Sequence, residues 1–154
     1  MIKIPKRGQG FLFVRRVPSL AFNVLGLTVA VVGVGIAVSG IVDLIDGGPD
    51  VVALLVTGLV TGTVGFVVWD YTTIPSGIRV LDVFTTVTVA WVTIAAVGAI
   101  PYLVTGHFTS VDDALFEAMS GFTTTGATVT ADIEATSKGL LFWRSTTQWM
   151  GGMG

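Results

Sequence analysis

A threonine-rich stretch near the C-terminal end of the chain holds the residues best suited to chemistry. This threonine stretch consists of Thr123, Thr124, Thr125, Gly126, Ala127 and Thr128. Backbone carbonyl oxygens of such a stretch can replace the water around a dehydrated cation. Gly126 can adopt a positive φ at little cost and so turn its carbonyl oxygen toward an ion. We therefore predict an ion-binding site at Thr123, Thr124, Thr125, Gly126 and Ala127.

Other candidates are few. The sequence has no cysteine, which excludes disulfides and thiolate metal sites. It also lacks a catalytic carboxylate pair, a nucleophile–base set and a metal-ligand cluster, so we expect neither an enzyme nor a cofactor. His107 is either a pH sensor or an ordinary interfacial histidine.

Acidic residues gather around the threonine stretch: Asp112, Asp113, Glu117, Asp132 and Glu134. They either concentrate cations at the mouth of a site or form an ordinary solvated face. Glu117 differs from the others because it lies in an apolar segment, where a charge is costly and often functional. It is either a functional carboxylate or the structural partner of a base such as Arg144.

The segment before the threonine stretch must hold it in place. Ser110 and Asp113 have the spacing of a capping box, with Ser110 as N-cap. A short apolar helix is predicted over 112–120, with Gly121 as its stop. Nine residues extend about 14 Å, half a bilayer. A half-helix followed by polar backbone favours a re-entrant loop, and an external helix with a threonine-rich loop is the alternative.

The composition indicates an integral membrane protein. Hydrophobic residues make up 52% of the chain and charged residues 12%, whereas a soluble domain carries about 25% charge. A membrane span needs about 20 apolar residues. Runs of this length without a charge occur at Leu20–Val42, Val51–Trp69 and Val83–Gly106. They predict an all-α protein with three spans before the threonine stretch.

The distribution of charge predicts the orientation of these spans. Residues 1–19 hold Lys3, Lys6, Arg7, Arg15 and Arg16, five of the eight basic residues. The positive-inside rule places this end in the cytoplasm. A nucleic-acid-binding arm is not expected directly before a span, so nucleic acid is not a predicted partner. The loop Asp43–Asp50 carries three acids and no base, which suits the outer side.

Glycines recur on one face of each of the first two spans. They are Gly26, Gly33 and Gly40 in the first, and Gly58, Gly62 and Gly65 in the second. Such faces let helix backbones approach closely in a membrane. We expect residues 20–70 to form a packed two-span hairpin, and chance glycine in a glycine-rich chain is the alternative.

A second apolar helix follows the threonine stretch. Residues 131–138 form a polar connection, and an apolar run starts at Gly139. The run to Gly154 is too short for a span, so we expect the chain to stop inside a fourth span. Trp143 and Arg144 fit an interfacial anchor.

Residues 112–154 resemble the first pore loop, and the start of the outgoing helix that follows it, in the Trk/Ktr/HKT superfamily of potassium transporters. The segments that carry the resemblance are Phe116–Thr128, Gly139–Ser145 and Gln148–Gly154. Two spans before the first repeat favour a Trk-type membrane subunit. The resemblance implies four helix–pore–helix repeats around one pore, of which 83–154 would be the first, incomplete in its outgoing helix.

The resemblance also implies a function. The chain would be a membrane subunit of a potassium uptake transporter in the cell membrane, contributing one of four selectivity-filter strands. Potassium would bind at the backbone carbonyls of Thr124, Thr125 and Gly126. The expected partners are a second copy of the chain and a cytosolic nucleotide-binding regulatory subunit. A non-transporting membrane fragment and a sodium-preferring relative remain the alternatives.

Overall fold

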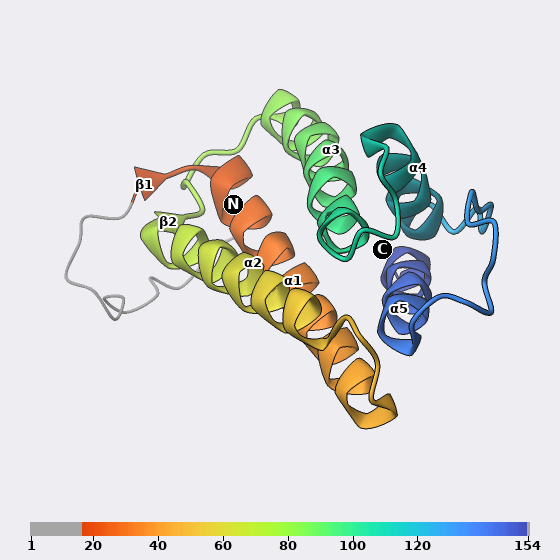
Figure 1. The fold of residues 1–154 in the computed structure, drawn as a ribbon. Coiled ribbons are helices and arrows are strands. Elements are labelled where there is room, and N and C mark those ends of the chain that lie inside the picture. The colour runs from red at the N-terminus through yellow and green to blue at the C-terminus, as the bar shows by residue number, and fades with distance from the viewer. Residues whose placement is uncertain (1–16, 154) are drawn as a thin grey trace.

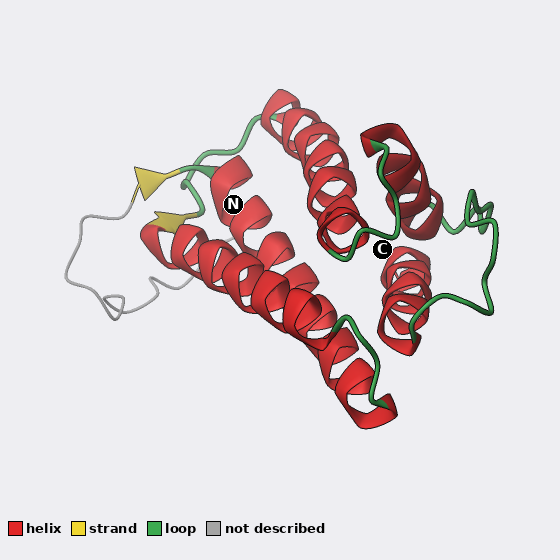
Figure 2. Ribbon diagram, in the orientation of Figure 1, coloured by secondary structure: helices red, strands yellow, loops and turns green. Residues whose placement is uncertain are grey.

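The computed structural model describes residues 17–153 and is built almost entirely of helices (Figure 1, Figure 2). The helices are α1 (Leu20–Asp46), α2 (Val51–Tyr71), α3 (Val80–Val104), α4 (Val111–Phe122) and α5 (Lys138–Met153). Two short strands, β1 (Val17–Pro18) and β2 (Thr72–Thr73), pair in parallel where α1 begins and α2 ends. The all-α prediction is confirmed. The five basic residues that carry the orientation argument lie outside the described residues.

Three of these helices are long and apolar enough to cross a membrane. They are α1, α2 and α3, with 27, 21 and 25 residues. This confirms the three predicted spans, with shifted ends. The first continues to Asp46 because Gly47, in the left-handed region at φ 73°, ends it. The third begins at Val80, after Arg79, whose backbone amide donates to the Asp82 carboxylate at 3.0 Å.

The glycine faces of α1 and α2 pack against each other. A Cβ added at Gly33 would collide with the backbone of Gly62. At Gly58 and Gly65 it would collide with the α1 backbone at Ala37 and Ala30. The packing interpretation of both glycine faces is therefore confirmed. The close approach makes residues 20–71 a paired support for the rest of the chain.

The helices α3, α4 and α5 form a second group, which packs against α1 through α3 and α5 (Figure 1). Trp143 of α5 is fully buried at its centre, and its Nε1 donates to the Gly98 carbonyl of α3 at 3.1 Å. Phe122 of α4 presents its ring to Trp143 edge-on, with centroids 6.3 Å apart. The expectation that Trp143 is an interfacial anchor is wrong, because the indole holds three helices together.

We predict that Gly33→Ala lowers the midpoint of thermal unfolding of the purified protein in detergent. A methyl group there meets backbone, and overpacking of this kind costs about 1–3 kcal/mol. Gly62→Ala is the matched control, since its added Cβ finds its nearest neighbour at 3.8 Å. It should be neutral or gain up to about 1 kcal/mol from helix propensity. Equal midpoints for the two variants would contradict the packing described.

Candidate functional site

The half-helix α4 runs through Val111–Phe122, 12 residues, or about 18 Å, which is still too short to cross a bilayer. The expected stop at Gly121 is wrong. Gly121 lies inside the helix, where an added Cβ would collide with the side chain of Thr147 in α5. Gly121 therefore serves the close packing of α4 on α5 and not the end of the helix.

The start of α4 also differs from expectation. Ser110 is the N-cap residue, but its side chain makes no capping bond to the helix, so the predicted capping box with Asp113 is wrong. The Ser110 hydroxyl donates instead to the Asp112 carboxylate, and this bond lowers the pKa of Asp112. Asp112 and Asp113 still lie in the first turn, where negative charge suits the helix dipole.

A threonine in the left-handed region ends α4. Thr124 has φ 59°. Its amide donates to the Gly121 carbonyl at 2.9 Å, and the Thr125 amide donates to the Ser120 carbonyl at 3.0 Å. These two bonds form a Schellman cap, a position that glycine usually occupies. A β-branched residue there is uncommon, and such backbone strain gathers at functional sites. Nothing in a run of three threonines could have indicated which one takes this conformation.

The first backbone amides of the threonine stretch donate hydrogen bonds to the end of α4. The amides of Thr123–Gly126 all donate to carbonyls of Met119–Gly121, at 2.9 to 3.3 Å. Among residues 17–153, the carbonyl oxygens of Thr123, Thr124 and Thr125 receive no hydrogen bond. In this part of the chain, these three oxygens therefore differ from the next two carbonyls, which accept hydrogen bonds from side chains.

Gly126 has the predicted positive φ, at 75°. Its carbonyl oxygen, however, accepts a hydrogen bond from Nη2 of Arg144 at 2.9 Å. The next carbonyl, of Ala127, accepts from the Ser120 hydroxyl at 2.6 Å. Of the five predicted site residues, the three threonines thus have carbonyl oxygens without a hydrogen-bond donor in the described part of the chain. The carbonyl oxygens of Gly126 and Ala127 accept hydrogen bonds from side chains. Potassium binding at Thr124, Thr125 and Gly126 stays a prediction.

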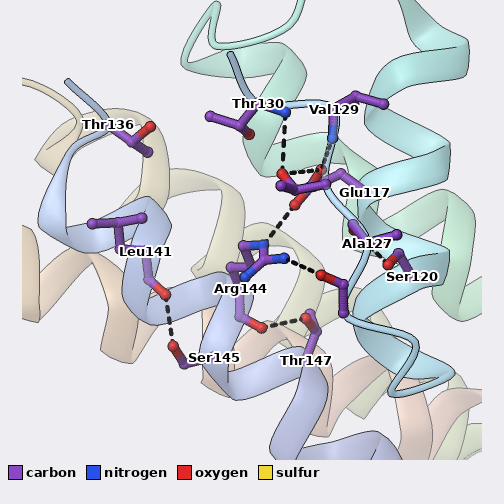
Figure 3. Close-up of polar contacts among 12 residues, drawn as sticks. Glu117, Ser120, Ala127, Val129, Thr130, Thr136, Leu141, Arg144, Ser145 and Thr147 are labelled. Carbon is purple, nitrogen blue, oxygen red and sulfur yellow. Dashed lines mark hydrogen bonds and ion pairs between the residues drawn. The ribbon is translucent and has the colours of Figure 1, made fainter. Parts of the chain in front are cut away.

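Glu117 and Arg144 form the ion pair that the sequence suggested (Figure 3). Nε of Arg144 donates to Oε1 of Glu117 at 2.6 Å, and the two side chains are 26% and 1% exposed. The other carboxylate oxygen accepts from the Thr128 hydroxyl at 3.0 Å and the Val129 amide at 3.1 Å. The pair therefore binds the threonine stretch both at Gly126 and beyond Ala127. The expectation that Arg144 is an interfacial anchor is therefore wrong. Arg144 is part of this site.

Asp43 is a residue that sequence reasoning missed. The sequence places it in an outer acidic loop, but it lies in α1 and is fully buried. Its carboxylate accepts from the Gly139 amide at 3.0 Å and from the Asp50 amide at 2.8 Å. Because Gly139 lies in the first turn of α5, Asp43 caps the helix that carries Arg144. The position of Asp43 near the end of a predicted span did not indicate that it caps another helix.

The remaining acidic and histidine candidates have local roles. His107 Nε2 lies 3.2 Å from the Thr130 hydroxyl, and its ring packs on Tyr102 and Phe108. Asp132 accepts from the backbone amides of Glu134 and Ala135, so it closes a turn. Within the described residues, His, Cys, Asp and Glu side chains do not gather in a group of three that could hold a metal ion.

We predict that Asp43→Asn destabilises the protein by about 1–3 kcal/mol, because the amide has one oxygen for two N–H groups and leaves one buried donor unpaired. The measurement is thermal unfolding of the purified protein in detergent. Asp46→Asn, an exposed change on the same helix, is the control and should leave the midpoint unchanged. An Asp43→Asn protein as stable as this control would refute the capping role.

Comparison with known proteins agrees with this architecture. The family model described as "TrkH: Cation transport protein" matches residues 77–154. An uncharacterized cation transporter of Methanocaldococcus jannaschii is 33% identical over 132 residues, which are 86% of this chain and 28% of the relative. The Trk system potassium uptake protein TrkI of Halomonas elongata is 32% identical over 72% of this chain and 23% of its own length.

The fold has a counterpart among solved structures. The crystal structure of the potassium transporter TrkH from Vibrio parahaemolyticus superposes with a TM-score of 0.78 and 31% identity. The match covers 87% of this chain and 29% of that one. The chain thus spans less than a third of the length of each of these relatives. The Trk-type resemblance seen in residues 112–154 is confirmed and extends over most of the chain. The chain belongs to the TrkH family of cation transport proteins.

Proposed function

We propose that the chain is the membrane subunit of a potassium uptake transporter, to which the threonine stretch contributes one selectivity-filter strand. The observation that carries the proposal is the row of three carbonyl oxygens, from Thr123 to Thr125, that lack a donor at the end of a half-helix. Two of the matched relatives, from Halomonas elongata and Vibrio parahaemolyticus, are named for potassium uptake or transport. Those names support potassium as the ion, and the carbonyls without a donor support cation binding by this segment.

The physical basis is the replacement of water by fixed carbonyl dipoles. A partly dehydrated cation needs several oxygen ligands held at a fixed separation. The negative end of the α4 dipole adds about half a unit of charge at the same point. The proposed ligands are the oxygens of Thr124 and Thr125, to which the sequence prediction adds Gly126. That third oxygen is the one that already accepts from Arg144.

The orientation and the partners follow from the same proposal. We propose that the protein lies in the cell membrane with its N-terminus in the cytoplasm, which the basic residues within 1–16 support. A homodimer and a cytosolic nucleotide-binding regulatory subunit are proposed from the family resemblance. Because the chain spans less than a third of its relatives, residues outside it would supply the other filter strands.

We predict that Gly126→Ser weakens selectivity for potassium and that Gly126→Asp abolishes uptake. At φ 75° a side chain is strained, at a cost of about 1–2 kcal/mol, and the carbonyl leaves its position. The assay is rubidium uptake, with sodium as competitor, in potassium-transport-deficient cells that express the protein from its complete gene.

Gly106→Ser is the matched control, because Gly106 has φ 73°, is exposed and lies outside the threonine stretch. It carries the same backbone strain and should leave selectivity unchanged. Unaltered selectivity in Gly126→Ser would refute the filter assignment. An unmodified protein that takes up no rubidium would refute the transporter proposal and favour a non-transporting membrane protein.

A further inference from the structure

The guanidinium of Arg144 joins two elements that carry the threonine stretch. One edge binds the Glu117 carboxylate of α4 through Nε at 2.6 Å, and Nη2 binds the Gly126 carbonyl at 2.9 Å. Figure 3 shows the Arg144 guanidinium beside the Glu117 carboxylate. A planar guanidinium holds two acceptors in a fixed geometry, whereas a lysine ammonium acts as a point charge. Arg144 therefore fixes the direction of the Gly126 carbonyl relative to α4 and α5.

The Gly126 carbonyl is set apart from those before it. The oxygens of Thr123–Thr125 have no donor in the described part of the chain, but the Gly126 oxygen has a charged one. A cation approaching that oxygen also approaches the positive charge of Arg144, and like charges repel. The Gly126 oxygen is thus a weaker cation ligand than its three neighbours.

We propose that Arg144 is a positioning residue that determines ion selectivity. It holds the Gly126 carbonyl toward α5 and so leaves the carbonyls of Thr123, Thr124 and Thr125 to meet the ion. Selectivity depends on the size of the site and on the number and field strength of its carbonyls. Release of the Gly126 carbonyl from Arg144 changes the size of the site and the number and field strength of its carbonyls. This inference rests on the proposed potassium transport. In it, the Gly126 carbonyl is not an ion ligand, as the sequence predicted, but an acceptor held in place by Arg144.

A purely structural role for Arg144 is the competing explanation. Glu117 is buried, and a buried carboxylate without its partner is costly, so loss of Arg144 alone would harm folding for that reason. The double variant Glu117→Gln/Arg144→Met separates the two roles. It removes both charges, so no buried charge is left unpaired, but it also removes the donor to Gly126.

The experiment measures competition of sodium with rubidium uptake in potassium-transport-deficient cells that express the protein from its complete gene. The variants are Arg144→Met, the double variant, and Arg144→Lys, with membrane expression of each measured by immunoblot. Lys138→Met is the control, since Lys138 is an exposed cation on the same helix. It should match the unmodified protein in uptake and selectivity.

We expect the double variant to reach the membrane and to lose discrimination of rubidium from sodium by about tenfold or more, since a hydrogen bond to a charged group is worth at least one power of ten in an equilibrium constant. Arg144→Lys should restore part of this loss. Selectivity equal to that of the unmodified protein in the double variant would overturn the proposal and leave Arg144 as a counter-ion only.

Two further outcomes are decisive. If neither methionine variant accumulates in the membrane, Arg144→Lys decides, because unchanged selectivity in it would show that charge alone suffices and would overturn the positioning role. If the unmodified protein takes up no rubidium, the transporter proposal itself fails. That result differs from a failure of the inference, in which uptake persists and selectivity does not depend on Arg144.

Discussion

The site depends on one buried carboxylate and the groups that surround it. Glu117 is 1% exposed in a half-helix, and a charge so placed is tolerated only with a counter-ion and hydrogen bonds. Here the counter-ion comes from α5 and the hydrogen bonds come from beyond Ala127. Satisfying Glu117 therefore requires α4, α5 and the threonine stretch to meet in one arrangement. The ion pair and hydrogen bonds of Glu117 therefore fix the position of the threonine stretch, which has no regular secondary structure.

The remaining helices supply the rigidity that this arrangement needs. The glycine faces bring α1 and α2 into backbone contact, and Asp43 at the end of α1 caps the start of α5. Trp143 then links α5 to α3 through the Gly98 carbonyl. Arg144 follows Trp143 directly, so its guanidinium starts from one of the most closely packed points of the protein. The two-span hairpin thus supports the site without contributing to its surface.

Sequence reasoning reached those features that local pattern determines. Uncharged apolar runs gave the three spans, glycine spacing gave the helix–helix contact, and a lone acid in an apolar segment led to the Glu117–Arg144 pair. It failed where a residue's role depends on a distant partner. Gly121 looks like a stop, but Thr147 of α5 requires a glycine there. Asp43 looks like a loop acid because its acceptor role involves an amide 96 residues away in the sequence.

The Schellman cap on α4 has a mechanical consequence. The four amides of Thr123–Gly126 are the groups that close the end of the helix, so this backbone cannot rearrange without opening the last turn. Each such bond contributes about 0.5–1.5 kcal/mol net, and an orphaned buried group costs more. A rearrangement of this backbone would therefore break several hydrogen bonds at once. For the transporter proposed above, this predicts that the threonine stretch keeps one backbone shape with and without a bound ion.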